Sequence, residues 1–138
     1  MFDHCIYFNT TALARRLERE WAVVFEPFDL SPPQAFMLRV ILSKPGILQR
    51  DLAEELGISR PTATRALDHL CRKKLVRRRA SDQDGRETEL VPTDKAVSIQ
   101  EPIDEASGSV TRKIKKIIGD ENFSETVAKV RGVRSALK

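Results

Sequence analysis

The chain has 138 residues, of which 41% are hydrophobic and 32% are charged, so it is long enough for one folded domain and is not composed like a disordered chain. It carries 24 Lys and Arg against 20 Asp and Glu, a formal net charge of +4 at pH 7. This charge is too small to identify a nucleic-acid partner by itself.

The same composition excludes several classes of protein. The longest unbroken apolar run, residues 21–25, is too short to span a membrane, and residues 1–4 do not have the pattern of a secretory signal. The two cysteines, Cys5 and Cys71, can form neither a disulfide framework nor a four-ligand zinc site. We therefore expect a cytoplasmic protein without a membrane segment, a metal or a cofactor.

Two helices are predicted in the first third of the chain. Residues 10–26 place apolar side chains at helical spacing from Leu13 to Val24. Ser31 is suited to cap a second helix that stops at residues 44–46. This second helix is apolar nearly all round, so it is expected inside the core.

Two shorter helices and a pair of strands follow. A helix over residues 48–56 leads through a tight turn at 57–59 into a second helix, which Ser59 caps. The buried stripe expected on this second helix is Ala63, Ala66, Leu67 and Leu70. Residues 75–78 and 87–91 flank a loop rich in Asp and Gly, which predicts a β-hairpin.

The last third is predicted to be helical. Thr93 caps a long helix whose apolar residues recur every three or four positions over residues 99–117. A bend or break is expected at Pro102, and Gly119 is suited to end the helix. Residues 123–137 indicate one more helix. The predicted fold is therefore mainly α with one β-hairpin.

Helix, tight turn, capped helix and basic hairpin, in that order, form a winged helix-turn-helix. The major groove of B-DNA admits one α-helix, whose N-terminal residues reach the edges of the bases. The free N–H groups of that first turn also bind phosphate. The candidate DNA contacts on this recognition helix are Ser59, Arg60, Pro61, Thr62, Thr64 and Arg65.

Positive charge is concentrated in this part of the chain. Residues 60–86 contain nine Lys or Arg and three Asp or Glu, a net charge of +6 that leaves −2 for the remainder. If four to six of the basic side chains contact phosphate, the logarithm of affinity falls against the logarithm of salt concentration with a slope of about −4 to −5. A basic run alone is often only a solvated surface, so the order of the elements carries the prediction.

Five stretches of the chain resemble the MarR (multiple antibiotic resistance regulator) family. They are residues 52–59 (LAEELGIS), 62–70 (TATRALDHL), 73–78 (KKLVRR), 82–86 (DQDGR) and 90–96 (LVPTDKA). The likeness is continuous over about residues 30–96, and the flanking helices agree in number and order. The chain departs from the usual family pattern at Lys74 and Ala96, where Gly is usual, and at Pro92, where Leu is usual.

This resemblance implies a single domain over residues 1–138 that acts as a homodimeric transcriptional regulator, most commonly a repressor. It would bind a pseudo-palindromic operator in double-stranded DNA. Residues 31–93 would form the winged helix-turn-helix, and residues 1–30 and 94–138 the dimerisation helices. The apolar stripes of the two end segments agree with this, because a winged core covers only part of them. The alternative is that these stripes pack within one chain.

In the wing, the resemblance implies that Arg86 enters the minor groove, with Asp84 holding its guanidinium group. A loop-tip arginine suits a narrow and electronegative minor groove. Arg77 on the first strand is also expected to contact DNA. The alternative for Asp84 and Arg86 is an exposed ion pair of little energetic consequence.

Cys5 raises the possibility of redox sensing. Some family members sense peroxides through a cysteine in the first helix, and Cys5 has a comparable place. The residues that follow it differ from that pattern, with Ile6 and Asn9 in place of Phe and Tyr. We therefore expect Cys5 to be a small buried or half-buried residue, and Cys71 to belong to the core.

Other family members release DNA when a small phenolic or aromatic carboxylate enters a crevice beside the dimer helices. The residues suited to such a pocket are four aromatics and two arginines: Trp21, Phe25, Phe28, Phe36, Arg15 and Arg39. Aromatic residues at helical spacing are more often plain core.

An enzyme is not indicated. The only histidines are His4 and His69, of which His69 lies on the recognition helix with no adjacent nucleophile, and the chain has neither a Gly-rich phosphate loop nor metal-ligand spacing. A winged helix that serves only protein contacts is a further alternative, and it predicts weak, sequence-independent binding to DNA.

Overall fold

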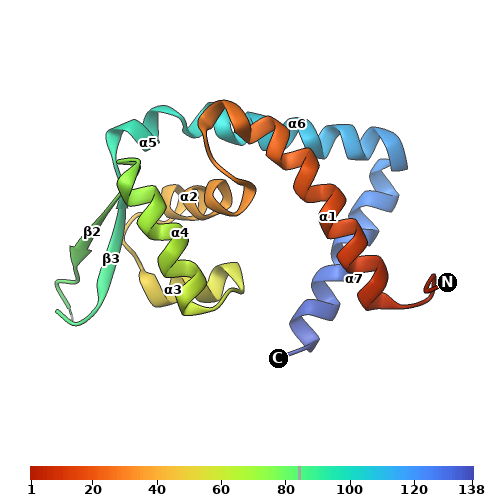
Figure 1. Ribbon diagram of the computed structural model, residues 1–138, viewed down its shortest axis with the longest axis horizontal. Coiled ribbons are helices and arrows are strands. Elements are labelled where there is room, and N and C mark those ends of the chain that lie inside the picture. Colours follow the sequence, from red (N-terminus) through yellow and green to blue (C-terminus); the bar gives the residue numbers. More distant parts are fainter. Residues whose placement is uncertain (84) are drawn as a thin grey trace.

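The computed structural model describes residues 1–83 and 85–138, and it is mainly helical with one small sheet (Figure 1). Its elements, in chain order, are α1 (Ile6–Phe25), the 3-10 helix η1 (Glu26–Phe28), α2 (Pro32–Ser43), β1 (Ile47–Leu48), α3 (Gln49–Leu56), α4 (Arg60–Arg72), β2 (Val76–Ala80), β3 (Thr88–Pro92), α5 (Asp94–Ser98), α6 (Gln100–Ile118) and α7 (Asp120–Ala136). The predicted class, mainly α with a β-hairpin wing, is confirmed.

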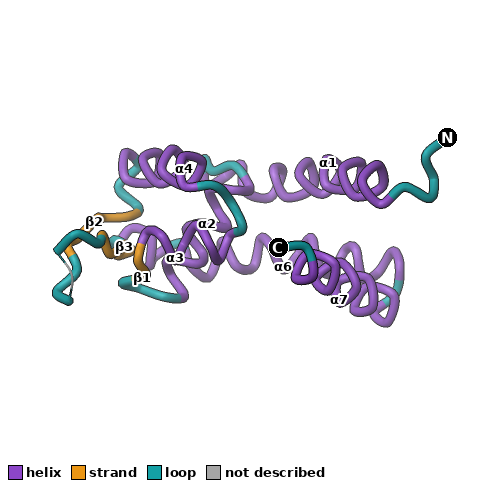
Figure 2. The backbone as a smooth tube through the Cα atoms, turned by 90° about the horizontal axis from the view of Figure 1, so that it is seen from below, coloured by secondary structure: helices purple, strands orange, loops and turns teal. Residues whose placement is uncertain are grey.

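The elements form two lobes (Figure 1). The winged lobe comprises α2, α3, α4 and the sheet, and the helical lobe comprises α1, α6 and α7. Figure 2 shows the β2–β3 hairpin at one end of the molecule and the helical lobe at the other. None of the helices in the described residues is long and apolar enough to cross a membrane.

The core lies in the winged lobe and at its junction with α1 and α6. Helix α2 lies in the core, as predicted, through Pro32, Ala35, Met37, Leu38, Ile41 and Leu42. Its burial is not all round, because Phe36 is 38% exposed. On α4, Ala63, Leu67 and Leu70 are buried, and Ala66 packs against them. Phe25 of α1 and Ile103 of α6 join this core without any exposed surface.

The helix ends follow the capping residues found in the sequence. The Ser31 hydroxyl accepts a hydrogen bond from the Gln34 backbone N–H, and the Gln34 side chain accepts one from the Ser31 N–H, which makes a capping box. The Thr93 hydroxyl caps α5. Gly119 ends α6 with a φ of 92°, a conformation that glycine adopts without a steric penalty.

The sheet has one strand more than predicted. Strand β3 pairs antiparallel with β2 on one side, from Val76 opposite Pro92 to Ala80 opposite Thr88. On its other side it pairs with β1, where Ile47 lies opposite Leu90. Strand β1 has two residues, which is too short to show the alternation that marks a strand in a sequence.

The break in the last third lies earlier than predicted. Helix α5 ends at Ser98, and Ile99 separates it from α6. Pro102 lies in the first turn of α6, where its missing N–H has no acceptor within the helix, so it causes no break. The first helix also begins earlier than predicted, at Ile6.

Candidate nucleic-acid interface

The N-terminus of α4 presents an ordered polar face to solvent. Arg60, Pro61, Thr62 and Arg65 are exposed. The Ser59 hydroxyl accepts from the Thr62 backbone N–H at 3.3 Å and donates to Thr62 Oγ1 at 2.9 Å. Arg65 Nη2 donates to the same Oγ1 at 3.3 Å. Ser59 therefore both caps the helix and orients two exposed side chains of its first turns.

Thr64 does not share this outer face. It is half-buried, and its hydroxyl donates to the Arg60 carbonyl at 2.9 Å and accepts from Gln49 Nε2 of α3 at 3.2 Å. Its polar group therefore joins α3 to α4 instead of pointing to solvent. Thr64 follows Ala63 and lies three residues before Leu67, so helical periodicity already places it beside the buried stripe.

The wing presents three consecutive exposed arginines from β2, of which two are paired within the protein. Arg78 bonds Asp68 of α4, and Arg79 Nη2 lies 2.8 Å from Glu89 Oε2 on β3. Arg77 makes no ion pair with the described residues. The two pairs fix the wing to α4 and neutralise part of its positive charge.

The net charge of this region consequently overstates the cations available to a ligand. Lys73 is also paired, with its Nζ 2.7 Å from Asp29 Oδ2. Among the described residues, Lys73, Arg78 and Arg79 of residues 60–86 thus have acidic partners, two of which lie outside that range. Those that remain exposed without an ion pair to the described residues are Arg60, Arg65, Arg72, Lys74 and Arg77.

The second half of the wing loop, from Arg86 onwards, borders a small hollow beside the recognition helix. Exposed Arg86 borders this hollow of about 240 Å³, together with Arg60 of α4 and Arg50 of α3. Arg50 Nη1 bonds Glu87 Oε1 at 3.2 Å, which ties the second half of the wing loop to α3. Arg50 was not among the DNA contacts predicted from the sequence. Asp84, the expected partner of Arg86, lies outside the described residues.

The family departure at Lys74 preserves the local backbone. Lys74 adopts a φ of 61°, in the left-handed region that favours the glycine usual at this position. The Thr93 hydroxyl donates to the Lys74 carbonyl at 2.7 Å. This bond helps to hold the tight connection from α4 into β2.

Of the six residues considered for an effector pocket, two line the same hollow. Trp21 and Phe36 border a space of about 530 Å³ between α1, α2 and α3, and Arg134 of α7 reaches its edge. Phe25 was expected with them but is completely buried in the core, with its ring edge-on to Phe36 at 6.0 Å. The predicted cluster is therefore only partly assembled.

The other three residues of that set lie elsewhere. Phe28 borders a separate hollow beside Lys73. Arg15 is exposed on α1 and does not line the hollow of Trp21. The Arg39 guanidinium stacks 5.0 Å over the Phe36 ring and is hydrogen-bonded to α6.

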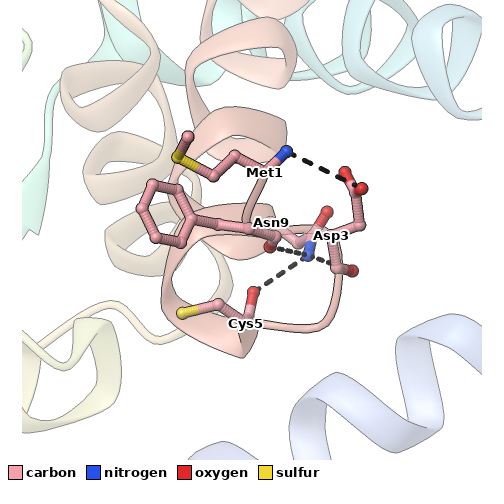
Figure 3. A network of polar contacts seen from close by, with 5 residues as sticks. Met1, Asp3, Cys5 and Asn9 are labelled. Carbon is pink, nitrogen blue, oxygen red and sulfur yellow. Dashed lines mark hydrogen bonds and ion pairs between the residues drawn. The ribbon is translucent and has the colours of Figure 1, made fainter.

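Cys5 is exposed, so the expectation that it is buried or half-buried is wrong for this chain. It is the N-cap residue of α1, whose only buried residue is Phe25 at the opposite end of the helix. Figure 3 shows the Asn9 side-chain amide donating to the carbonyl oxygens of Cys5 and Asp3, both at 2.9 Å. Cys71 packs against the core as expected, and burial raises the pKa of its thiol.

The helical lobe leaves many apolar side chains uncovered. A groove of about 500 Å³ between α1, α6 and α7 is lined by Leu13, Leu17, Trp21, Ile114, Ile118, Phe123, Val127 and Val130. We call this the apolar groove. Monomeric proteins rarely expose contiguous apolar patches of this kind, which more often mark an association site.

Comparison with known proteins identifies related chains. A sequence model of the MarR family matches residues 28–87. The uncharacterized HTH-type transcriptional regulator YybA of Bacillus subtilis (strain 168) is 31% identical over 87 residues, which are 63% of this chain. The match spans 58% of that relative, which is less than two thirds of its length.

Solved structures share the fold over nearly all of the chain. The MepR–DNA complex of S. aureus matches with a TM-score of 0.86 at 21% identity, over 95% of this chain and 96% of MepR. The PcaV regulator of Streptomyces coelicolor, solved with its natural ligand, matches with a TM-score of 0.81 at 21% identity over 100% of both chains. The related proteins are transcriptional regulators and not enzymes, as expected. The resemblance of the sequence to the MarR family is confirmed over residues 28–87, and the solved structures show the same fold over nearly all of the chain.

Proposed function

We propose that the chain is a sequence-specific DNA-binding regulator of transcription. The observation that carries this proposal is the outer face of α4, where Ser59 orders Thr62 and, through it, Arg65. A guanidinium group bonds the edge of guanine through two donors, and a threonine hydroxyl bonds phosphate. In this proposal Arg65 reads a base edge, and the wing arginines Arg77 and Arg86 contact the backbone and the minor groove.

The proposed DNA-binding unit is a homodimer. A second copy placed against the apolar groove would cover the exposed side chains of α1, α6 and α7 in both chains. Two-fold symmetry would then present two α4 helices to successive major grooves, and the operator would be pseudo-palindromic. MepR, which shares the fold, was solved with DNA. Such a protein works in the cytoplasm.

Repression released by a small molecule is the proposed regulatory behaviour. A dimer that covers two half-sites occludes an overlapping promoter. Trp21 and Phe36 supply aromatic faces, and Arg134 a positive charge, to one hollow between the two lobes. A small phenolic or aromatic carboxylate has the matching chemistry. PcaV offers a precedent for ligand binding on this fold.

The effector proposal is tested with 4-hydroxybenzoate as the probe. Trp21 is the only tryptophan of the chain, and its fluorescence serves as the probe. It borders both this hollow and the apolar groove, whereas Phe36 borders only the hollow, so Phe36→Ala tells the two sites apart. We expect saturable quenching, release of DNA at the same concentrations, and loss of both in Phe36→Ala. Quenching without release of DNA would contradict regulation through this hollow.

DNA binding is tested by selecting duplexes from a random library and measuring affinity for a selected and a scrambled sequence. Arg65→Ala should weaken binding to the selected duplex by about 5- to 150-fold, because a bidentate base contact contributes about 1–3 kcal/mol of discrimination. Its affinity for the scrambled duplex should change little. Arg19→Ala, which removes an exposed charge from α1, is the control. Equal affinity of the unmodified chain for both duplexes would instead favour a winged helix for protein contacts.

The exposure of Cys5 favours a second candidate, release of DNA by peroxide. Oxidation of a sensor thiol requires access, which this side chain has. If Cys5 is the sensor, peroxide weakens operator binding in the unmodified chain and not in Cys5→Ser. Equal behaviour of the two proteins would exclude this candidate.

A further inference from the structure

One serine hydroxyl joins three helices from both lobes. Ser107 of α6 is buried, and it is the one buried polar side chain of the part of the molecule that the structure describes. Its Oγ accepts a hydrogen bond from Trp21 Nε1 of α1 at 3.0 Å and another from Arg39 Nη1 of α2 at 3.0 Å. Both lone pairs of the hydroxyl oxygen are therefore engaged.

Arg39 makes a polar connection between the lobes, beside the apolar contacts of Phe25 and Ile103 with the core. Besides its bond to Ser107, its Nε donates to Asp104 Oδ1 at 2.8 Å. Asp104 and Ser107 are three residues apart on α6, so they lie on one face of the helix, where a single guanidinium fork reaches both. The Phe36 ring, 5.0 Å below the guanidinium carbon, fixes the plane of the fork.

This contact is partly shielded from water. The Arg39 side chain is 28% exposed and that of Asp104 is 48% exposed. A charge-assisted hydrogen bond in such a position defines geometry better than an ion pair at the open surface. By contrast, the pair between Glu20 and Lys113 joins α1 to α6 within the helical lobe and leaves the winged lobe untouched.

We propose that Arg39 is a positioning residue, which fixes the orientation of the winged lobe on α6 and so sets the half-site spacing that a dimer accepts. The proposal rests on the proposed function, operator binding by a dimer. The helical lobe would hold the two copies together, whereas α4 lies in the winged lobe, so a rotation at this junction changes the separation of the two recognition helices. Each base pair added between half-sites moves one of them by about 3.4 Å and rotates it by roughly 35°.

The test measures affinity against spacing. Duplexes carry two selected half-sites at the best spacing and at spacings one and two base pairs longer or shorter, and a further duplex carries one half-site. We expect the unmodified chain to lose at least about tenfold in affinity for a change of one base pair. Arg39→Met keeps an apolar stem over Phe36 but removes the fork. It should bind the best spacing about tenfold more weakly and the other spacings within roughly threefold of each other, because its lobes sample more orientations.

Three comparisons make the result decisive. Arg112→Met removes the pair with Glu105 within α6, with the same change in charge, and should keep the spacing profile of the unmodified chain. Arg39→Lys, which reaches only one acceptor, should lie between the unmodified chain and Arg39→Met. Asp104→Ala leaves Arg39 in place and removes the acceptor of its Nε–H. This variant serves if Arg39→Met folds poorly, and it too should flatten the profile.

An unchanged profile in Arg39→Met, or in Asp104→Ala where the former does not fold, would overturn the proposal. A uniform loss at all spacings and on the single half-site would also overturn it, because that is the result of a purely structural role. If the unmodified chain shows no preference among duplexes, the proposed function fails instead.

Discussion

The two lobes differ in how completely they cover their own apolar side chains. In the winged lobe, Leu38, Leu52 and Leu67 have no exposed surface. In the helical lobe, α7 has no buried residue, and Val127 and Val130 are 45% and 52% exposed. The winged lobe is a closed unit, whereas the helical lobe has a surface suited to a second copy. We therefore propose that the winged lobe binds DNA and that the helical lobe forms the dimer.

The largest effect is expected from a charge placed in the apolar groove. Val130→Glu should convert the dimer to a monomer and lower operator affinity by more than about 100-fold. The reason is that a chain bound at one half-site no longer holds a second chain close to the other half-site. Sedimentation measures the mass, and far-UV circular dichroism should remain helical. Val97→Glu is the matched control, because Val97 is 54% exposed but lies on α5. A Val130→Glu protein that remains dimeric would show that the helical lobe is not the interface.

A cavity in the winged lobe should act on stability. Leu67→Ala is expected to lower the free energy of unfolding by about 2–5 kcal/mol, because this fully buried side chain leaves a space that its neighbours fill only in part. Urea denaturation gives the value. Val97→Ala should change it by less than about 0.5 kcal/mol. A loss below about 1 kcal/mol in Leu67→Ala would mean that the core of this lobe is less closed than the structure shows.

Loss of the cap of the recognition helix should have a smaller effect. Ser59→Ala removes the acceptor for the Thr62 N–H and should cost about 1 kcal/mol of stability. Operator affinity should also fall, because Thr62 loses a partner that orients it. Ser109→Ala, whose hydroxyl bonds its own helix α6, should leave both quantities unchanged. If Ser59→Ala and Ser109→Ala bind the operator with the same affinity, the cap of α4 does not contribute to DNA binding.

The smallest effect concerns the link between η1 and the end of α4. The hydrogen bond and charge of Lys73 hold the pKa of the Asp29 carboxyl below its ordinary value. Because the folded-state pKa is the lower one, this pair stabilises the protein above the unfolded pKa of about 3.9 and ceases to do so as the pH falls through the folded value.

Asp29→Asn isolates this contribution. Asparagine tolerates the left-handed φ of 55° at this position, so the backbone is preserved. Thermal melts should show the variant to be less stable than the unmodified chain at pH 7, and the difference should vanish in acid. A difference that is constant over pH 2–7 would assign it to something other than the ion pair.

Local signals predicted the winged lobe well. Ser31 and Ser59 correctly predicted where two helices begin. Each side chain accepts a hydrogen bond from an N–H of the first helical turn, and this does not depend on what the helix packs against. The apolar stripe of α4 follows from helical periodicity, and so does the outer position of Arg60 and Arg65. These features depend on neighbours a few residues away.

The remaining features depend on contacts between distant residues. Arg39 and Ser107 are 68 positions apart, and Asp29 and Lys73 are 44 apart, so no local pattern joins them. The exposure of Cys5 depends on how far α1 projects beyond the core, which its sequence does not specify. For the same reason, the composition of residues 60–86 did not reveal that Arg78 and Arg79 are paired.

One titration tests the central claim most directly. A palindromic duplex from the selection is titrated with the chain, and the mass of the complex is measured by sedimentation beside that of a scrambled duplex. Our account predicts two chains on each palindromic duplex, with binding at least about 1,000-fold tighter than to the scrambled one at the same salt concentration. One chain on each duplex, or equal affinity for both sequences, would contradict it.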